Sequence, residues 1–374
     1  MNIVLAGDFA SNVHERPMAD AMERLGHRVD RFPWHTYVRG ATAHASAFSP
    51  GLHLRKAQNK YLAGPMIARI NRDLIERVTA AHCDLLFVYR GTHIRKATLE
   101  EIRRRRPGTR LVGYNNDDPF APQQPRWAWR HFIESLPVYD HVLAYRPHNL
   151  DDFRAAGARS IGLLLPWFDP AVHHPVALSP ESRREYESDA IFVGHYEPDM
   201  RLRSLEALVE AGVAVRVFGP AVGRRGYDWH PPLSGSSRLR ALMPVREIWD
   251  ADYARALSAS KIGLCFFSKL NRDRYTRRCF EIPATGKLLL SEYSPELAEM
   301  YREGVEAEFF RTPEELVKKA RFYLANPAAR EAIAKRGYDR VHRDGHDVDS
   351  RVRRMLDELD DRRRDMPPVN ASPR

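Results

Sequence analysis

The chain alternates short apolar runs with longer stretches in which apolar residues recur every three or four positions. In the N-terminal half, the amphipathic stretches at 18–25, 67–80 and 98–106 predict helices. The apolar runs between them predict buried strands at 3–6, 27–32, 84–89, 110–114, 141–145 and 161–165. Strands separated by helices in this way favour a parallel sheet that is covered on both faces. Residues 38–62 show no sustained period, so we interpret them as an irregular loop.

Residues 166–187 predict a linker, because proline is frequent there and no period is sustained. The alternation then restarts, with predicted strands at 189–194, 213–218, 261–267, 288–290 and 309–310. The predicted helices lie at 202–211, 251–260, 276–286, 295–301, 313–324, 327–341 and 347–362, and a loop is expected at 219–237.

This order predicts an α/β protein with two tandem doubly wound (Rossmann-like) parallel-sheet domains, at residues 1–165 and 188–345. Ligands of such sheets bind outside the carboxyl ends of the strands. Two facing domains would place the site in a cleft between them. The polar tail at 362–374 is expected to be disordered.

Composition fits a soluble globular chain, with 43% hydrophobic and 29% charged residues among 374. No apolar run approaches the roughly 20 residues needed to span a bilayer. The start MNIVLAGDFA predicts a first strand rather than a signal peptide. The three widely spaced cysteines, Cys83, Cys265 and Cys279, predict neither a disulfide framework nor a metal site, which favours the cytoplasm.

The formal net charge of +10 comes more from arginine than from lysine. A basic chain suits an anionic partner such as a nucleotide diphosphate, a membrane surface or nucleic acid. Runs such as 103–106 equally fit solvated helix ends, where cations offset the helix dipole. The positive charge also allows peripheral contact with the anionic inner face of a membrane. We expect no specific binding of nucleic acid.

The run YTRRCFEIPATGKLLL at 275–290 predicts a helix that ends at Gly286 and feeds a buried strand. Glu281 lies among apolar neighbours in that helix. A buried charge is costly unless it has a partner. A ligand rich in hydroxyl groups is one such partner, and Arg277 or Arg278 on the same helix is another.

A second motif follows the predicted strand at 189–194, where Gly194 and His195 lead into a helix with Arg201 near its start. Free backbone N–H groups at such a turn bind phosphate readily. Gly194 lets the backbone approach a ligand, and Arg201 offers paired donors. An ordinary strand–turn–helix with solvated arginines fits the same pattern.

The segment from Thr276 to Gly286 resembles the signature of the CgeB-like branch of the group 1 glycosyltransferases, which are nucleotide-sugar-dependent enzymes of the GT-B fold. The resemblance implies that Glu281 holds the ribose hydroxyls and that the segment, Thr276 included, lies at the donor site. It also implies that Arg201 contacts the diphosphate together with Gly194. Many members carry an arginine where this chain has His195.

Many family 4 glycosyltransferases have two glutamates separated by seven residues, and Asp273 stands at that spacing before Glu281. The resemblance implies that Asp273 contacts the donor sugar, and the spacing favours retention. Instead of contacting the sugar, Asp273 could cap the following helix. Lys269 is expected to face the donor, and Arg278 to neutralise the departing diphosphate. The resemblance further implies that the helix at 346–361 crosses back to the N-terminal domain.

Acidic residues follow two strands of the N-terminal domain, namely Asp8 and the pair Asp117 and Asp118. Each is a candidate catalytic carboxylate for an acceptor hydroxyl. A plain turn or helix start explains the pair equally well. His14, His131 and His148 are candidates by residue type alone.

The resemblance implies a glycosyltransferase that moves a sugar from a nucleoside-diphosphate sugar to a hydroxyl of a glycan, lipid-linked glycan, protein or metabolite. We expect it to need neither a cofactor nor a metal, because arginine and lysine stabilise the leaving group in this fold. A nucleotide-sugar epimerase of the same fold is one alternative. The second alternative is a non-catalytic basic protein that binds nucleic acid or an anionic membrane. Trp127 and Trp129, which lie between arginines, would be its binding residues.

Overall fold

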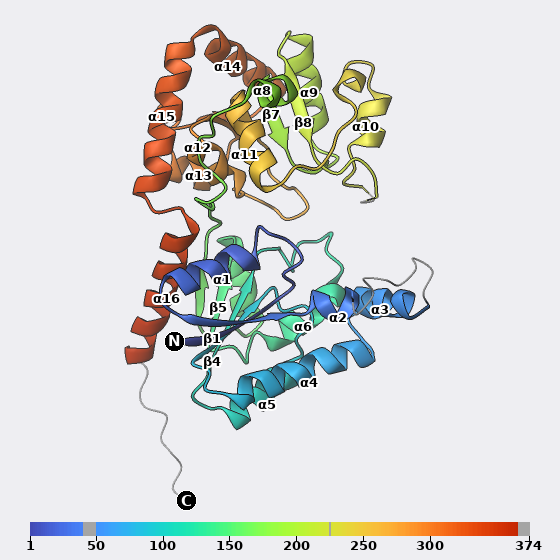
Figure 1. The fold of residues 1–374 in the computed structure, drawn as a ribbon, viewed down its shortest axis with the longest axis vertical. Coiled ribbons are helices and arrows are strands. Elements are labelled where there is room, and N and C mark those ends of the chain that lie inside the picture. Colours follow the sequence, from blue (N-terminus) through green and yellow to red (C-terminus); the bar gives the residue numbers. More distant parts are fainter. Residues whose placement is uncertain (40–49, 224–225, 366–374) are drawn as a thin grey trace, which may run out of the picture. The chain divides into compact units, whose positions relative to one another are not determined.

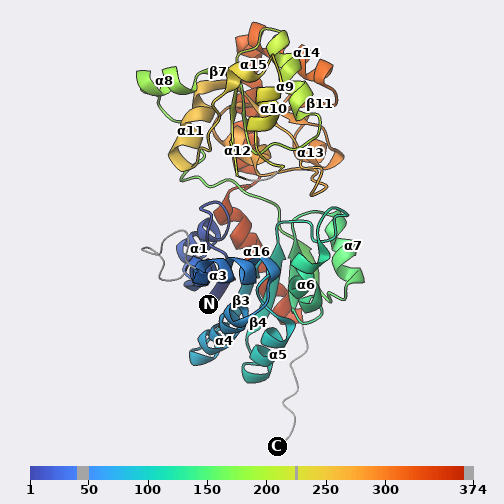
Figure 2. The same cartoon turned by 90° about the vertical axis from the view of Figure 1, so that its right-hand side faces the viewer.

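A computed structural model describes residues 1–39, 50–223 and 226–365, and the chain divides into two compact units. Unit 1 combines Met1–Leu165 with Val348–Arg374, and unit 2 is Pro166–Asp347. Each unit contains a parallel β-sheet with helices on both faces (Figures 1 and 2). No helix within the described residues has the length and apolar character needed to cross a bilayer.

The sheet of unit 1 has the strand order β2-β1-β3-β4-β5-β6, and neighbouring strands are parallel. Its strands are β1 (Asn2–Gly7), β2 (Arg28–Pro33), β3 (Leu85–Tyr89), β4 (Arg110–Asn115), β5 (His141–Ala144) and β6 (Ile161–Leu163). The central strand β3 is buried at all five residues, which explains its continuous apolar sequence.

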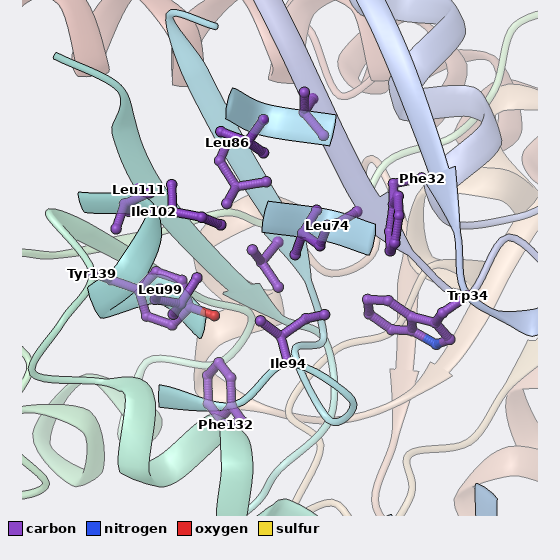
Figure 3. Packing of buried hydrophobic residues seen from close by; sticks show 14 of the residues in the cluster. Phe32, Trp34, Leu74, Leu86, Ile94, Leu99, Ile102, Leu111, Phe132 and Tyr139 are labelled. Atoms are coloured by element: carbon purple, nitrogen blue, oxygen red, sulfur yellow. The ribbon is translucent and has the colours of Figure 1, made fainter. Parts of the chain in front are cut away.

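The helices of unit 1 are α1 (Glu15–Arg24), α2 (His35–Arg39), α3 (Pro50–Tyr61), α4 (Pro65–Ala80), α5 (Lys96–Arg105), α6 (Arg126–Ser135), α7 (His148–Ala155) and α16 (Val348–Asp365). Side chains of α4, α5 and α6 pack on one face of the sheet. Figure 3 shows Leu74, Leu99 and Phe132 from these helices around Leu86 of β3. All four side chains are fully buried.

Helix α16 packs beside α1 within unit 1 (Figure 1). Its inward residues Val352, Met355, Leu356 and Leu359 are each at most 4% exposed. Arg24 of α1 forms an ion pair with Asp349 at the start of α16. The last helix therefore completes the core of the N-terminal unit.

The sheet of unit 2 has the strand order β11-β10-β9-β7-β8, again with parallel neighbours. Its strands are β7 (Ser188–Val193), β8 (Val215–Phe218), β9 (Ser260–Cys265), β10 (Leu288–Glu292) and β11 (Glu308–Phe310). Because all strands run the same way, their carboxyl ends share one edge of the sheet.

The helical elements of unit 2 are α8 (Pro180–Tyr186), α9 (Arg201–Glu210), α10 (His230–Gly235), η2 (Arg240–Leu242), α11 (Asp250–Ala259), α12 (Arg278–Ala284), α13 (Pro295–Met300), α14 (Pro313–Ala325) and α15 (Pro327–Arg343). Leu205 of α9 and Leu316 of α14 share a core with the strands. Helix α12 lies so close to β9 that a Cβ at Gly263 would be 2.5 Å from Ile282 Cγ2. A glycine in β9 is therefore required to seat α12 on the sheet.

The structure differs from the sequence prediction mainly by helices that were not predicted, such as α6 and α7. The predicted loop at 38–62 contains α3, and its part at 40–49 lies outside the described residues. The predicted linker contains α8, which begins where Ser179 Oγ accepts a hydrogen bond from the Ser182 amide at 3.2 Å. The predicted loop at 219–237 contains α10. Helix α16 continues to Asp365, so the start of the predicted disordered tail is helical.

Candidate functional site

The carboxyl edge of the unit 2 sheet collects most of the predicted ligand-binding residues. Gly194 directly follows β7, Lys269 follows β9, and Glu292 ends β10. Helix α12, which carries Arg278 and Glu281, begins at the same edge because it connects β9 to β10. The topology of the sheet therefore brings residues from distant parts of the sequence together.

The backbone of Gly194 is held on both sides. Its amide donates to Phe218 O at 2.9 Å, and its carbonyl accepts from Trp229 Nε1 at 2.7 Å. A Cβ at Gly219 would lie 2.1 Å from Gly194 O, so a glycine is needed there for the two loops to meet. The Gly194 amide therefore pairs with the end of β8 and is not one of the free N–H groups expected at this turn.

The guanidinium of Arg278 lies beside Gly194 at this edge. A Cβ at Gly194 would be 3.3 Å from Arg278 Nη1, and the guanidinium carbon lies 5.5 Å from the centre of the Phe192 ring. Its Nε is buried and has no hydrogen-bond partner among the described residues. Burial disfavours the charged form of the Arg278 guanidinium. Nearby ionisable groups, Cys265 first among them, nevertheless raise the pKa of Arg278. The site thus holds a charged group with unused donor capacity.

The carboxylate of Glu281 is 3% exposed and lies within a network of unit 2 side chains. Tyr253 donates to Oε2 at 2.7 Å, and Arg277 Nε donates to Oε1 at 2.8 Å. The ring of His173 lies 3.6 Å from Oε1. Burial works against ionisation, but Arg277 and His173 hold the pKa of Glu281 at about 2. The carboxylate is therefore ionised near neutral pH, and the predicted pairing with Arg277 is present.

Arg201 is 1% exposed and is surrounded by internal partners. Its two terminal nitrogens donate to the carbonyls of His195 at 3.0 Å and Phe267 at 3.1 Å. The carboxylates of Glu197 and Asp199 lie 3.5 and 3.4 Å away. These contacts hold the loops after β7 and β9 together. The Nε of Arg201, like that of Arg278, has no hydrogen-bond partner among the described residues, and the diphosphate contact stays a prediction.

Glu197 joins the same two loops. It is 1% exposed and accepts from His195 Nε2 at 2.8 Å and from the Lys269 amide at 3.0 Å. Burial opposes its ionisation, but the bond from His195 and the charge of Arg201 hold the pKa of Glu197 at about 2. The ammonium of Lys269 pairs with Glu292. The predicted residues His195 and Lys269 thus lie at one edge and share a carboxylate partner.

Thr276 and Asp273 precede α12. Thr276 is 8% exposed, and its carbonyl accepts from the Cys279 amide at 3.0 Å. The amide of Asp273 donates to Ser268 O at 2.8 Å. The N-cap residue of α12 is Arg277, with no side-chain capping bond, so Asp273 does not cap this helix.

The predicted catalytic residues lie at the carboxyl edge of the unit 1 sheet. Asp8 follows β1, and its amide donates to Glu15 Oε1 at 3.0 Å. Burial raises the pKa of Glu15, which is 3% exposed. No hydrogen bond or ion pair of the Asp8 carboxylate is found within the described residues.

Asp117 and Asp118 have different surroundings. Asp117 forms an ion pair of 2.6 Å with Arg90 and is partly exposed. Asp118 is 0% exposed and accepts from His148 at 3.1 Å and from Asn149 at 2.9 Å. Asp118 therefore organises the loop after β4, and His148 is one of its partners.

Sequence reasoning missed several members of these networks. Tyr253 and His173 carried no detectable signal, because each lies far in sequence from Glu281. Glu197 lies only four residues before Arg201, so this spacing could have indicated the pair. Glu15 could have been noticed as an acid at the start of a helix after β1. Within the described residues, no group of three or more His, Cys, Asp or Glu side chains is arranged to hold a metal ion.

The comparisons with known proteins agree with this arrangement. Residues 201–357 match the model of a family described as glycosyl transferase-like. No curated protein sequence matches the chain. Together with the two parallel sheets, the structural matches below show that the chain has the GT-B fold of glycosyltransferases.

Three solved structures illustrate the likeness. Sucrose-phosphate synthase from Thermosynechococcus elongatus is 12% identical, with a TM-score of 0.71 over 98% of this chain and 100% of that one. Anabaena HepE in complex with UDP and glucose is 16% identical, with a TM-score of 0.66 over 96% and 100%. A trehalose-6-phosphate synthase studied for glycosyl transfer with retention is 13% identical, with a TM-score of 0.64 over 96% and 99%. The narrower resemblance to the CgeB-like branch stays a prediction.

Proposed function

We propose that the chain is a glycosyltransferase that binds a nucleoside-diphosphate sugar at the carboxyl edge of unit 2. The match of residues 201–357 to a glycosyl transferase-like family supports this assignment. The structural likeness to HepE, which was solved with UDP and glucose and with UDP-glucose, favours a uridine diphosphate sugar as donor.

The observation that carries the proposal is the unused guanidinium of Arg278 beside Gly194. A half-buried cation whose buried Nε lacks a hydrogen-bond partner favours an anionic ligand, and charge-assisted bonds to phosphate are among the strongest in proteins. In a transferase, the same cation would stabilise the negative charge that develops on the departing diphosphate. We therefore assign Arg278 to the diphosphate and Arg201 to positioning the loop around it.

Glu281 is our proposed ribose contact. An ionised carboxylate has about four acceptor positions, more than its bonds from Tyr253 and Arg277 use. Asp273 and Lys269 are proposed to face the transferred sugar, and Asp8 to face the acceptor hydroxyl. Retention is supported by the seven-residue spacing and by the likeness to the trehalose-6-phosphate synthase. We further propose that the enzyme transfers a hexose, needs no metal ion and works in the cytoplasm.

The test is calorimetric titration of the full chain with UDP, GDP, TDP, CDP and ADP. We expect one diphosphate to bind, and Arg278→Gln to weaken that binding by about tenfold or more, as expected for a lost charge-assisted bond. Arg203→Gln is the control, because Arg203 is exposed on α9. Failure of every diphosphate to bind, or equal affinity in both variants, would reject the donor assignment.

Product analysis then separates transfer from epimerisation. With the preferred nucleotide sugar and no acceptor, a transferase should at most hydrolyse the donor slowly. Interconversion of the sugar within the nucleotide conjugate would instead identify an epimerase.

A further inference from the structure

Unit 2 contains a cavity of about 510 Å3 at the edge of its sheet opposite to Gly194 and Arg278. Ser260 and Leu288, which begin β9 and β10, form its floor. Residues of α15 line it together with Arg183 of α8.

The lining carries more positive than negative charge. Its cations are Arg183, Lys261, Lys287, Arg330 and Lys335, against the two acids Glu187 and Glu331. Such a concave surface with one dominant sign concentrates ligands of the opposite sign.

Several of these cations already have partners. Lys261 pairs with Asp189 at 2.7 Å, and Lys335 pairs with Asp339 at 2.8 Å. Arg330 donates to Tyr323 O at 2.9 Å and has a distant contact with Glu331 at 3.9 Å. The carboxylates of Asp189 and Asp339 offset part of the charge of Lys261 and Lys335, whereas Arg330 keeps donor positions beyond its bond to Tyr323 O.

Lys287 is different. It directly follows the turn at Gly286 and is only partly exposed. No side-chain hydrogen bond or ion pair of Lys287 is found in the described ranges 1–39, 50–223 and 226–365. Burial, together with Arg330 and Arg183, lowers the pKa of the Lys287 ammonium, while Glu331 opposes the shift. A cation placed among cations lacks a counter-charge that an anionic ligand would supply.

We infer that this cavity is a second ligand site, which binds a small phosphorylated molecule through Lys287, Arg183 and Arg330. A phosphate group offers three acceptor oxygens and about two negative charges, which suits three cations that line one cavity. The cavity volume falls within the range of small-molecule sites and exceeds what a bare phosphate requires. The ligand class is therefore a phosphomonoester of about the size of a sugar phosphate. The site is independent of the proposed donor site.

The test uses the full chain and three probes: inorganic phosphate, glucose 1-phosphate and uncharged glucose. Titration calorimetry is expected to show binding of both phosphate probes, with no binding of glucose. Lys287→Met should weaken glucose 1-phosphate binding about tenfold or more. Arg183→Gln, at an exposed position, should weaken it severalfold. Arg278→Gln should leave this binding unchanged, because Arg278 lies at the opposite edge.

Two controls keep the result interpretable. Lys318→Gln removes an exposed lysine of α14 outside the cavity and should bind both probes like the wild type. Lys287→Met without ligand should unfold at the wild-type temperature or above, since an uncompensated charge is removed. The inference is overturned if wild-type protein binds no phosphate probe at millimolar concentration. It is also overturned if Lys287→Met and Arg183→Gln bind as the wild type does, or if Arg278→Gln alone abolishes binding.

Discussion

Glu281 is a buried acid whose charge is balanced mainly by side chains of its own unit. Arg277 and Tyr253 hydrogen-bond to its two oxygens, and His173 approaches one of them. Its neighbours therefore explain why it is ionised, with or without a ligand. A substitution at Glu281 has two separable consequences, one for stability and one for donor binding.

Glu281→Gln should lower the free energy of unfolding by about 3 kcal/mol, because it leaves Arg277 without its buried partner. It should also weaken binding of the preferred nucleoside diphosphate, because an amide is a poorer acceptor for ribose hydroxyls than a carboxylate. Urea unfolding and calorimetric titration measure the two effects.

The matched control is Tyr253→Phe, which removes one hydrogen bond to Glu281 but keeps the carboxylate. It should lower stability less and leave nucleotide affinity close to the wild-type value. If Glu281→Gln destabilises the protein but binds the nucleotide normally, Glu281 serves the fold and the ribose assignment is wrong.

Residue types could be predicted from the sequence better than their partners. Glu281 is recognisable as an acid in an apolar helix, and Arg201 as a cation after a strand. The local sequence does not show that Arg201 donates hydrogen bonds to the carbonyls of His195 and Phe267, because Phe267 is 66 positions away. Arg278 looked secondary in the sequence, and only the fold shows that its Nε lacks a partner.

At the scale of elements, the strands and most long helices were predicted, whereas several other helices were missed, among them α6. The strands of both sheets and the helices α4, α14 and α15 follow from apolar periodicity. Helices α8 and α10, with seven and six residues, are too short to show a period. Helix α3 is longer, but its polar residues mask the pattern.

Helix α16 illustrates an element that serves a distant part of the chain. Leu356→Ala should lower the stability of unit 1 by about 3 kcal/mol, because the side chain is 3% exposed and its removal leaves a cavity. Hydrogen exchange at the amides of β1 and β3 should become faster, while exchange in β7 and β9 should change little.

Asp357→Ala is the control for this change, since Asp357 is the exposed neighbour on the same helix. Its exchange pattern should match the wild type. Equal effects of both substitutions, or a change confined to unit 2, would show that α16 does not contribute to the core of unit 1.

At the scale of the whole molecule, buried histidines make stability depend on pH. Burial is the first cause that lowers the pKa of His93 to about 3 and of His141 to about 4. Both are neutral in the folded chain near pH 5, whereas in the unfolded chain they titrate near 6.5. The unfolded state therefore binds more protons below pH 6.5, and stability falls as the pH decreases from there toward the folded pKa values.

His141→Gln should remove part of this dependence. Each buried histidine costs about 2 kcal/mol of unfolding free energy between pH 7.5 and about pH 5. The difference in unfolding free energy between these two pH values should therefore be smaller by about that amount in the variant. His174→Gln, at an exposed position, should behave like the wild type. An unchanged difference for His141→Gln would mean that His141 is charged or exposed in the folded protein.

The unpaired guanidinium of Arg278 has a consequence for how this protein evolves. A cation whose buried Nε bonds to nothing in the described part of the chain lowers the stability of the empty protein. Selection for heat resistance alone would therefore replace Arg278 with an apolar residue, and under its proposed role such survivors would be stable but unable to transfer a sugar. Libraries sorted by thermostability and libraries sorted by sugar transfer should diverge at this position, as expected where stability and activity trade against each other.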